Sequence, residues 1–333
     1  MDEKECKLPF ERIKRDILIR KKAKTSPNFG KDPYKRDIKE NIGYGIININ
    51  KPKGPTSHQV SSYIKDILKL DKCGHSGTLD PKVTGVLPTA TGRATRIVQT
   101  LLNAGKEYIC VMHIHKEVNE EELRKVIGSF VGKIKQLPPI KSAVKRQERY
   151  RKIYYLHVYE IIEKDVLFKV GCQAGTYIRK LCHDIGKKLG VGAHMAELIR
   201  TKAGPFNSES MFTIQDLEDS LYYFNKEGNE KYVRNVILPL EQAVTHLPKV
   251  WVLDSAVNSL CHGTDVGVPG ISKVESDIQL DETIAVMTLK EELVCLGKAR
   301  MISKDIQKKE KGIAIKVEKV FMLPGTYPKK RKE

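Results

Sequence analysis

The chain has 333 residues, 40% of them hydrophobic, which is enough for two domains with substantial cores. Its 59 Lys and Arg residues outnumber its 41 Asp and Glu residues and give a formal net charge of +18. This excess favours a polyanionic partner, and nucleic acid is the leading candidate because basic side chains bind phosphates and release counterions. No stretch approaches the roughly 18 consecutive apolar residues of a transmembrane helix, so we predict no membrane span.

The seven cysteines are scattered and form no CxxC pair, which argues against a zinc ribbon or a redox motif. Their odd number predicts reduced thiols, and the charged N-terminal stretch lacks the apolar region of a secretory signal, so we expect a cytoplasmic protein. His113 and His115 share one face of a predicted strand, but no third ligand is close in the sequence. We therefore predict no metal site there.

The spacing of apolar residues predicts interleaved strands and helices between a charged extension, residues 1–42, and a linker, residues 225–246. Thr56 or Ser57 can cap the first of the helices, and Asn119 the third. The predicted strands cover residues 43–50, 106–115 and 165–173. The predicted helices cover residues 58–70, 93–102, 119–130, 176–190, 194–201 and 216–224.

The character of the sequence changes after Pro248. Short apolar runs separated by Gly, Pro and charged turns predict a small all-β unit over residues 247–327, with short strands throughout its first part, residues 250–271. A basic tail, residues 328–333, follows it. The predicted organisation is thus an extension, a larger domain over residues 43–246 and a small β domain.

The stretch GHSGTLDPKVTGVLP (74–88) holds a single carboxylate, Asp80, among glycines, prolines and hydroxyl residues. Gly77 and Gly85 permit backbone conformations and close approaches that other residues do not. Pro81 biases Asp80 away from the helical region. A loop so constrained can hold the Asp80 side chain in one direction, as a catalytic group requires. A structural Asp that caps a turn is the simpler alternative.

Several known catalytic motifs do not fit this loop. A nucleophile elbow needs G-x-S-x-G, and here Gly77 comes one residue too early. An aspartic protease needs a second such Asp loop, and none is visible. A P-loop needs its Lys after the last Gly, which NKPKGPTS lacks. A lone carboxylate remains, and it can act as a nucleophile or as a general base.

Five motifs in order along the chain resemble those of the TruB family of pseudouridine synthases. They are KPKGPTS (51–57), GHSGTLDPKVTGVLP (74–88), GKEY (105–108), PPIKSAVKR (138–146) and AGTYIRKLCHDIG (174–186). The stretches DSAVNSLCHGTDVGVPGI (254–271) and GKARM (297–301) resemble a PUA RNA-binding domain. The basic extension is similar to that of the archaeal, dyskerin-like branch of the family, found in box H/ACA ribonucleoproteins.

This resemblance implies an α+β fold: a mixed, mostly antiparallel sheet flanked by helices, followed by a PUA pseudo-barrel. It also implies that the protein isomerises uridine to pseudouridine in RNA without a cofactor. Because a base inside a stem cannot reach such a site, the target nucleotide must be flipped out. A non-catalytic RNA-binding scaffold is the alternative from another functional class.

The resemblance places the catalytic carboxylate on Asp80, the aromatic ring that stacks on the target base on Tyr108, and the Arg that pairs with the carboxylate on Arg179. A guanidinium can hold a carboxylate through two hydrogen bonds and favours its ionised form. The expected substrate-binding or supporting residues are His75, which helps displace the nucleotide, Lys51 with Pro52 under the catalytic loop, Leu198 under the flipped base, and Tyr177 near the site.

A basic, tyrosine-containing run predicts an RNA-binding groove, since phosphates and stacked bases need these residue types. The run comprises Lys141, Lys145, Arg146, Arg149, Tyr150, Arg151 and Lys152. His183 and Asp184, in contrast, are expected to be hydrogen-bonded structural groups.

Two substrates stay open: the T-loop uridine of tRNA, position 55, modified without a guide, and rRNA uridines chosen by a guide RNA with small H/ACA proteins as partners. Between His115 and Asn119 this chain lacks the insertion with which bacterial members grip tRNA. That difference puts unguided tRNA modification in doubt. Ser76 replaces a Thr of the bacterial motif and keeps its hydroxyl.

Overall fold

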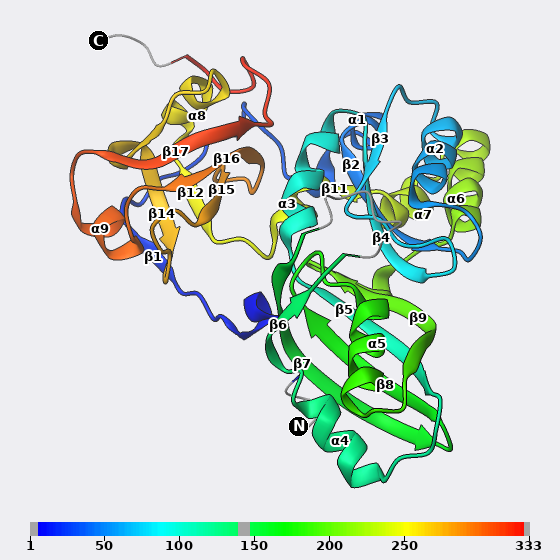
Figure 1. The fold of residues 1–333 in the computed structure, drawn as a ribbon. Coiled ribbons are helices and arrows are strands. Elements are labelled where there is room, and N and C mark those ends of the chain that lie inside the picture. Colours follow the sequence, from blue (N-terminus) through cyan, green and yellow to red (C-terminus); the bar gives the residue numbers. More distant parts are fainter. Residues whose placement is uncertain (1–5, 139–146, 330–333) are drawn as a thin grey trace. The chain divides into compact units, whose positions relative to one another are not determined.

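The computed structural model describes residues 6–138 and 147–329, and the chain folds into two compact units (Figure 1). Unit 1 comprises Met1–Arg12 and Ile46–Ile237, and unit 2 comprises Ile13–Gly45 and Leu238–Glu333. The N-terminal extension is therefore divided between the two units. In the part of the chain that is described, no helix is long and apolar enough to cross a bilayer.

Unit 1 is built on one large sheet with the strand order β2-β4-β9-β5-β8-β7-β6. Its neighbouring strands run antiparallel except β4 and β9, which are parallel. Two short strands extend it, β3 beside β4 and β10 beside β9. The bounds are β2 Gly45–Lys51, β3 Cys73–His75, β4 Thr84–Thr91, β5 Lys106–Ile114, β6 Gly132–Gln136, β7 Arg149–Ile162, β8 Asp165–Cys172, β9 Ala193–Ala203 and β10 Phe206–Asn207.

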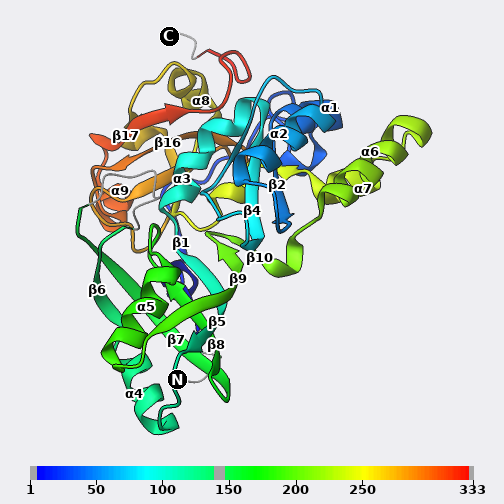
Figure 2. The ribbon, with the colours of Figure 1, turned by 45° about the vertical axis from the view of Figure 1, so that its right-hand side comes forward.

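The helices of unit 1 cover the sheet or extend from it, as Figures 1 and 2 show. Leu123 of α4 and Leu181 of α5 are buried in the same apolar core as Phe168 of β8. Thr56 caps α2 in a capping box with Gln59, and Asn119 caps α4, as predicted. The bounds are α2 Ser57–Ile67, α3 Val98–Asn103, α4 Glu120–Gly128, α5 Ile178–Lys188, α6 Ile214–Glu227 and α7 Glu230–Val236.

The predicted helix over residues 194–201 is wrong, because this segment is part of the central strand β9. Its residues pair along nearly the whole length of β5 on one side, and at Ile199 and Arg200 with β4 on the other. The local sequence HMAELIRT suits a helix, but the ladder of backbone hydrogen bonds to both neighbours outweighs that propensity. This difference matters, because it places Leu198 and Arg200 on one face of a strand.

The N-terminal segment of unit 1 is attached to the sheet by apolar and polar contacts. Leu8 is fully buried and packs with Tyr155. Lys202 Nζ donates to Glu11 Oε1 at 2.8 Å, and the Tyr155 hydroxyl donates to Glu107 Oε2 at 2.5 Å. Part of the extension thus behaves as an element of the unit 1 fold.

Unit 2 contains a second sheet with the order β1-β14-β12-β15-β16-β17-β13. The N-terminal extension contributes its edge strand β1, which pairs antiparallel with β14. The strand bounds are β1 Ile17–Ile19, β12 Lys249–Val252, β13 Val266–Gly267, β14 Ile271–Glu275, β15 Thr283–Met287, β16 Leu293–Ala299 and β17 Ile313–Val320. The helices are α1 Ile38–Gly43, α8 Asp254–Cys261 and α9 Ser303–Lys308, and a two-residue strand, β11 Leu238–Pro239, opens the C-terminal part.

Two predictions about the C-terminal part are corrected by the structure. Residues 254–261, expected as part of a run of short strands, form helix α8, whose apolar residues such as Val257 and Leu260 enter the core of unit 2. The segment expected as a linker, 225–246, contains α7 and a 3-10 helix, Leu240–Val244. Apolar residues three and four apart can face a core from a helix, which short-range alternation does not detect.

Candidate active site

Asp80 lies in the connection between β3 and β4, residues 76–83, which we call the Asp80 loop. Its carboxylate Oδ2 accepts a hydrogen bond from Nη2 of Arg179, 99 positions further along the chain. The side chains of Asp80 and Arg179 are 52% and 56% exposed, so the pair is open to a substrate. The structure therefore brings together the two groups on which the predicted chemistry depends.

Lys51 is hydrogen-bonded to the backbone of the Asp80 loop. Its side chain is fully buried, and Nζ donates to the carbonyl oxygens of Pro52, Pro81 and Val83 at 2.9, 3.2 and 2.9 Å. Burial, and then the charge of Arg200, lower the pKa of Lys51. The cation thus fixes the backbone directly after Asp80, which agrees with the supporting position expected for Lys51.

The turn that follows Lys51 makes further contacts with the same loop. The Ser57 hydroxyl accepts from the Leu79 N–H at 2.9 Å and donates to the Leu79 carbonyl oxygen at 3.3 Å. The Gly54 N–H donates to the Pro81 carbonyl oxygen at 2.9 Å. Backbone groups on both sides of Asp80 are therefore hydrogen-bonded to the 51–57 motif, which is why the carboxylate direction is well defined.

Gly85 lets the strand after the loop approach β9 closely. Its φ is +102°, and an added Cβ would lie 2.2 Å from the carbonyl oxygen of Arg200. Only glycine fits such a contact without displacement of the backbone.

Helix α5 presents Arg179 from its first turn, as predicted. Tyr177 is the N-cap residue but provides no side-chain cap. Instead Gln136, buried at the end of β6, accepts from the Tyr177 N–H at 3.0 Å and donates to the Tyr177 carbonyl oxygen at 3.1 Å. Sequence analysis missed Gln136, whose only signal was its position just before the PPIKSAVKR motif.

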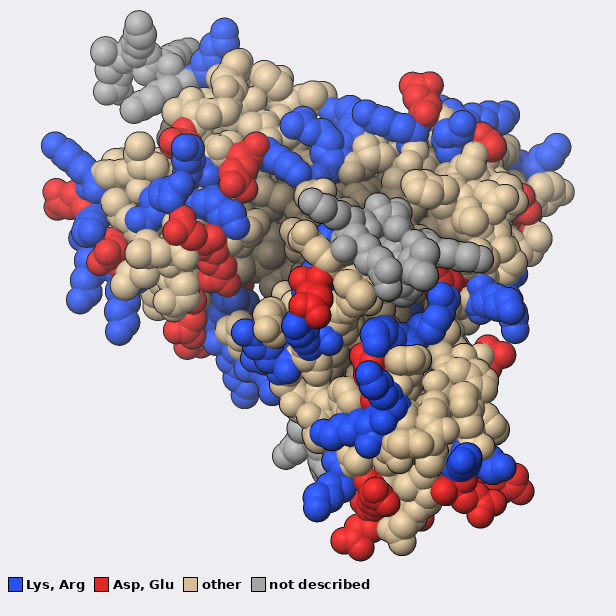
Figure 3. All heavy atoms as spheres, in the orientation of Figure 1, with Lys and Arg blue, Asp and Glu red and all other residues tan. Residues whose placement is uncertain are grey.

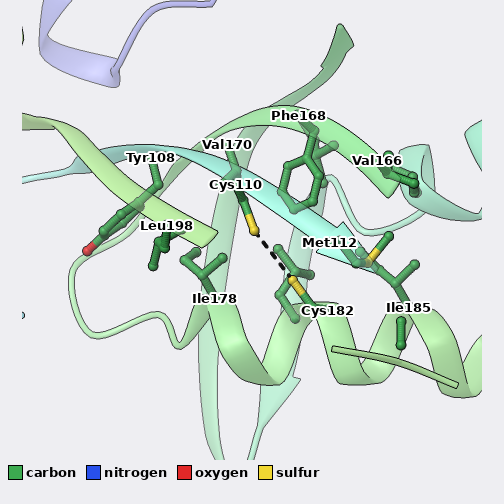
Figure 4. Packing of buried hydrophobic residues seen from close by; sticks show 14 of the residues in the cluster. Tyr108, Cys110, Met112, Val166, Phe168, Val170, Ile178, Cys182, Ile185 and Leu198 are labelled. Carbon is green, nitrogen blue, oxygen red and sulfur yellow. Dashed lines mark hydrogen bonds between the residues drawn. The ribbon is translucent and has the colours of Figure 1, made fainter. Parts of the chain in front are cut away.

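Tyr108 and Leu198 lie on adjacent strands, at the end of the core that faces the first turn of α5 (Figure 4). They are 9% and 7% exposed, and Ile178 of α5 packs in the same cluster. Deeper in this core, Sγ of Cys110 lies 3.6 Å from Sγ of Cys182. The ring expected to stack on the target base is thus held by a continuous apolar core.

Arg200, which sequence analysis did not select, is the largest fully buried side chain in the described residues. Its Nε donates to the Val86 carbonyl oxygen at 2.7 Å, and Nη2 donates to the Gly77 carbonyl oxygen at 3.2 Å. Arg200 is also the cross-strand partner of Tyr108 in the pairing of β5 with β9. The signal was present in the sequence, since Arg200 follows Leu198 by two residues, but the helix prediction for this segment concealed it.

His75 precedes the loop and is partly buried. Its Nδ1 accepts from the Gly77 N–H at 3.3 Å, and its ring makes an edge-to-face contact with His58 at a centroid distance of 4.8 Å. Burial, followed by the charges of His58 and Arg200, lowers the pKa of His75 to about 4. The imidazole is therefore neutral at physiological pH.

We expect the low pKa of His75 to make folding stability pH-dependent. The unfolded chain, with an ordinary His, takes up a proton below about pH 6.5, whereas the folded chain does so only near 4. The free energy of unfolding must therefore decrease as the pH is lowered through this window, by about 2 kcal/mol between roughly pH 7 and pH 5. Denaturant unfolding of wild-type protein and His75→Gln at both pH values measures it.

The variant His75→Gln is expected to lose most of this pH dependence, whereas His183→Gln, at an exposed His, is expected to keep it. An equal pH dependence in wild type and His75→Gln would contradict the assignment.

The basic run is only partly described by the structure. Lys141, Lys145 and Arg146 lie outside the described residues, whereas Arg149, Tyr150, Arg151 and Lys152 belong to β7. Tyr150 is 58% exposed, and Lys133 Nζ lies 4.2 Å from the centre of its ring. At the start of β7, Tyr150 and Lys152 are therefore exposed, whereas Arg149 and Arg151 are half-buried.

The remaining selected residues have local partners. His113 Nδ1 contacts Asp165 Oδ1 at 2.7 Å, and His115 Nε2 contacts His194 Nδ1 at 3.0 Å. His183 Nδ1 and Lys180 both contact the Asp184 carboxylate. Within the described residues, no three His, Cys, Asp or Glu side chains are grouped so that they could hold a metal ion.

Family models match nearly the whole chain. The one described as TruB family pseudouridylate synthase (N terminal domain) matches residues 65–178, and the tRNA pseudouridylate synthase B C-terminal domain matches residues 179–245. A PUA domain matches residues 248–321. A DKCLD (NUC011) domain matches residues 5–61.

Full-length relatives agree with these matches. A protein of Nanoarchaeum equitans named Probable tRNA pseudouridine synthase B is 53% identical over 329 residues, covering 99% of this chain and 94% of its own length. A protein of the same name from Pyrococcus furiosus is 54% identical over 319 residues, covering 95% of this chain and 94% of its own length.

Solved structures show the same similarity in three dimensions. One chain of a structure described as a Cbf5-Nop10-Gar1 complex is 54% identical, with a TM-score of 0.92, covering 97% of this chain and 98% of that chain. A second, from an H/ACA RNP bound to a substrate RNA containing 2'-deoxyuridine, is 51% identical, with a TM-score of 0.91, covering 98% and 100%. The predicted α+β fold with a C-terminal PUA domain is thereby confirmed, and the chain belongs to the TruB family of pseudouridine synthases.

Proposed function

We propose that this pseudouridine synthase is the catalytic subunit of a guide-directed ribonucleoprotein and that Asp80 is its reacting group. The pairing of Asp80 with Arg179 carries the proposal for the chemistry. The similarity over nearly the full length to a chain of an H/ACA RNP bound to a substrate RNA carries the proposal for the assembly.

The isomerisation needs a group that acts on the ribose or on its bond to uracil. The N1–C1′ bond breaks, the base rotates, a C5–C1′ bond forms, C5 loses its proton and N1 gains one. An ionised carboxylate can act here as nucleophile or as proton-abstracting base. Asp80 suits either route, because Arg179 is hydrogen-bonded to its carboxylate and its side chain is half exposed.

The groups around Asp80 suit an extruded uracil. Tyr108 provides a flat ring and Leu198 an apolar surface, and both are held in the core of unit 1. His75, whose pKa is lowered to about 4, is neutral and can contact the nucleotide as it is displaced. The Tyr108 hydroxyl is available for a proton transfer late in the reaction, after the base has rotated.

The connection between β5 and α4 favours a guided substrate. Strand β5 ends at Ile114 and α4 begins at Glu120, so no insertion like that of the bacterial tRNA enzymes is present. Modification of tRNA without a guide is the second candidate, and the name tRNA pseudouridine synthase B carried by the archaeal relatives favours it.

The charge distribution supports binding to RNA. Figure 3 shows Lys and Arg side chains over the part of unit 1 where β6 and α5 lie in Figure 1. There a depression of about 420 Å³ is lined by Lys135, Lys180 and Lys188, of which the first two are paired with Glu148 and Asp184 in the same lining. All seven cysteines are free thiols, which supports the proposal that the protein works in the reducing environment of the cytoplasm.

A reconstitution experiment tests the substrate assignment. The purified chain is incubated with a tRNA transcript, or with an rRNA fragment and a matching guide RNA, each with and without small H/ACA partner proteins, and the modified uridines are mapped. We expect efficient modification of the rRNA fragment only with guide and partners. Rapid modification of tRNA at the T-loop by the lone protein, with none of the guided target, would overturn the guided assignment.

A further inference from the structure

Arg200 is a buried cation without a carboxylate partner among the described residues. Its side chain is 1% exposed, and it takes part in none of the salt bridges found there. Burial of a guanidinium without a counter-charge costs several kcal/mol, and an apolar side chain could fill the same space more cheaply. Such a group indicates a requirement other than stability.

The hydrogen bonds of Arg200 join the two sides of the Asp80 loop. Gly77 lies before Asp80 and Val86 after it, and one guanidinium bonds the carbonyl oxygens of both. The backbone of Arg200 also lies opposite Gly85 in the parallel pairing of β4 and β9. Two buried cations thus hold the backbone around Asp80: Arg200 through Gly77 and Val86, and Lys51 through Pro81 and Val83.

The same guanidinium reaches the ring expected under the target base. Tyr108 and Arg200 are paired across β5 and β9, at a point where the register of the two strands shifts. Both side chains are buried. Burial raises the pKa of Tyr108, and the charge of Arg200 partly opposes that rise. Tyr108 therefore has a buried cation as its neighbour on the adjacent strand.

We propose that Arg200 is a positioning residue that sets the Asp80 loop and the Tyr108 hydroxyl relative to each other through one buried guanidinium. This inference rests on the proposed function of Asp80 and Tyr108. Neither Asp80 nor Arg179 touches Arg200 through a hydrogen bond in the described residues, so its effect on the reaction is exerted through Gly77, Val86 and Tyr108.

The test compares Arg200→Gln and Arg200→Lys with wild type in single-turnover reactions on an RNA that the wild-type protein modifies. Gln removes the charge and the forked geometry, and we expect the rate to fall about 100-fold, as when a preorganised donor is lost. Lys keeps the charge but lacks the planar set of N–H donors of a guanidinium. We therefore expect a partly restored rate, about 10-fold below that of wild type. The Kd for the RNA, measured by filter binding, is expected to change less than about twofold, since the buried side chain makes no contact with phosphates.

Arg36→Lys is the matched control. Arg36 is also buried, at 5% exposure, but it is paired with Glu241 in unit 2 by bonds of 2.9 and 3.2 Å. The Arg36→Lys variant is expected to have a lower melting temperature but the wild-type single-turnover rate when folded. A loss of rate in the Arg200 variants is thereby separated from a general loss of stability.

The outcomes separate this inference from the proposed function. A folded Arg200→Gln protein with the wild-type rate would overturn the positioning role while an inactive Asp80→Asn protein still supports the function. If Arg200→Gln does not fold, Arg200→Lys decides, and a wild-type rate for it overturns the role. An active Asp80→Asn protein would instead overturn the proposed function.

Discussion

Replacement of Asp80 by Asn is expected to abolish pseudouridine formation, with a rate at least about 1,000-fold lower than that of wild type. Asn has nearly the same shape but can neither attack a carbon atom as an anion nor accept a proton. Because the Asp80 side chain is half exposed, its replacement removes no core contact, so folding and RNA affinity should be retained. Single-turnover assays, circular dichroism and RNA binding measure the three quantities.

Asp165→Asn is the control for this prediction. Asp165 is also exposed and paired with a cationic or hydrogen-bonding partner, His113, but it lies at the start of β8, away from the Asp80 loop in sequence and contacts. It is expected to leave the rate unchanged. Full activity of Asp80→Asn would favour the non-catalytic scaffold, or would move the chemistry to another residue.

Replacement of Lys51 by Met is expected to lower both stability and activity. The side chain is fully buried and bonds three carbonyl oxygens, which Met would leave without a donor. We expect the free energy of unfolding to fall by about 3 kcal/mol. Because two of these carbonyls, those of Pro81 and Val83, lie within three residues after Asp80, the carboxylate should shift, and a displacement of the order of 1 Å costs about 100-fold in rate. Denaturant unfolding and single-turnover kinetics below the transition check both effects.

Lys106→Met separates the two effects of Lys51→Met. Lys106 is 5% exposed, and its Nζ bonds the carbonyl oxygens of Leu101 and Ala104 at the end of α3, not those of the Asp80 loop. Burial and the charge of Arg200 lower its pKa to about 7. Lys106→Met should therefore cost stability without slowing the folded protein. Equal losses of rate in both variants would show that Lys51 does not act through the loop.

Much of the site could be predicted because its residues stand in contiguous motifs with restricted backbone conformations. Asp80 is flanked by Pro81 and follows a Gly with positive φ, so a rigid loop could be recognised locally. Arg179 stands at the start of a helix with a strong amphipathic pattern, and Thr56 has the sequence context of a capping box. These features depend on neighbours within a few residues.

Other parts of the site depend on pairings between distant segments. Gln136 is significant only because β6 ends beside the first turn of α5, and its amide then fits both backbone groups of Tyr177. The division of the N-terminal extension between two units likewise follows from contacts with Tyr155 and with β14, far away in the sequence. No local pattern contains this information.

The sequence by itself therefore predicted the Asp80 carboxylate with its partner Arg179, the position of Tyr108 and the C-terminal PUA domain, because each is encoded in a short, chemically distinctive stretch. Only the tertiary structure decided that residues 193–203 form a strand, since ladders to β5 and β4 outweigh local helix propensity. That strand carries Arg200 into the interior, where one guanidinium bonds backbone carbonyls on both sides of Asp80 and lies across the sheet from Tyr108. A cation is stable in such a place only when a folded backbone supplies its acceptors, and this is a property of the assembled fold.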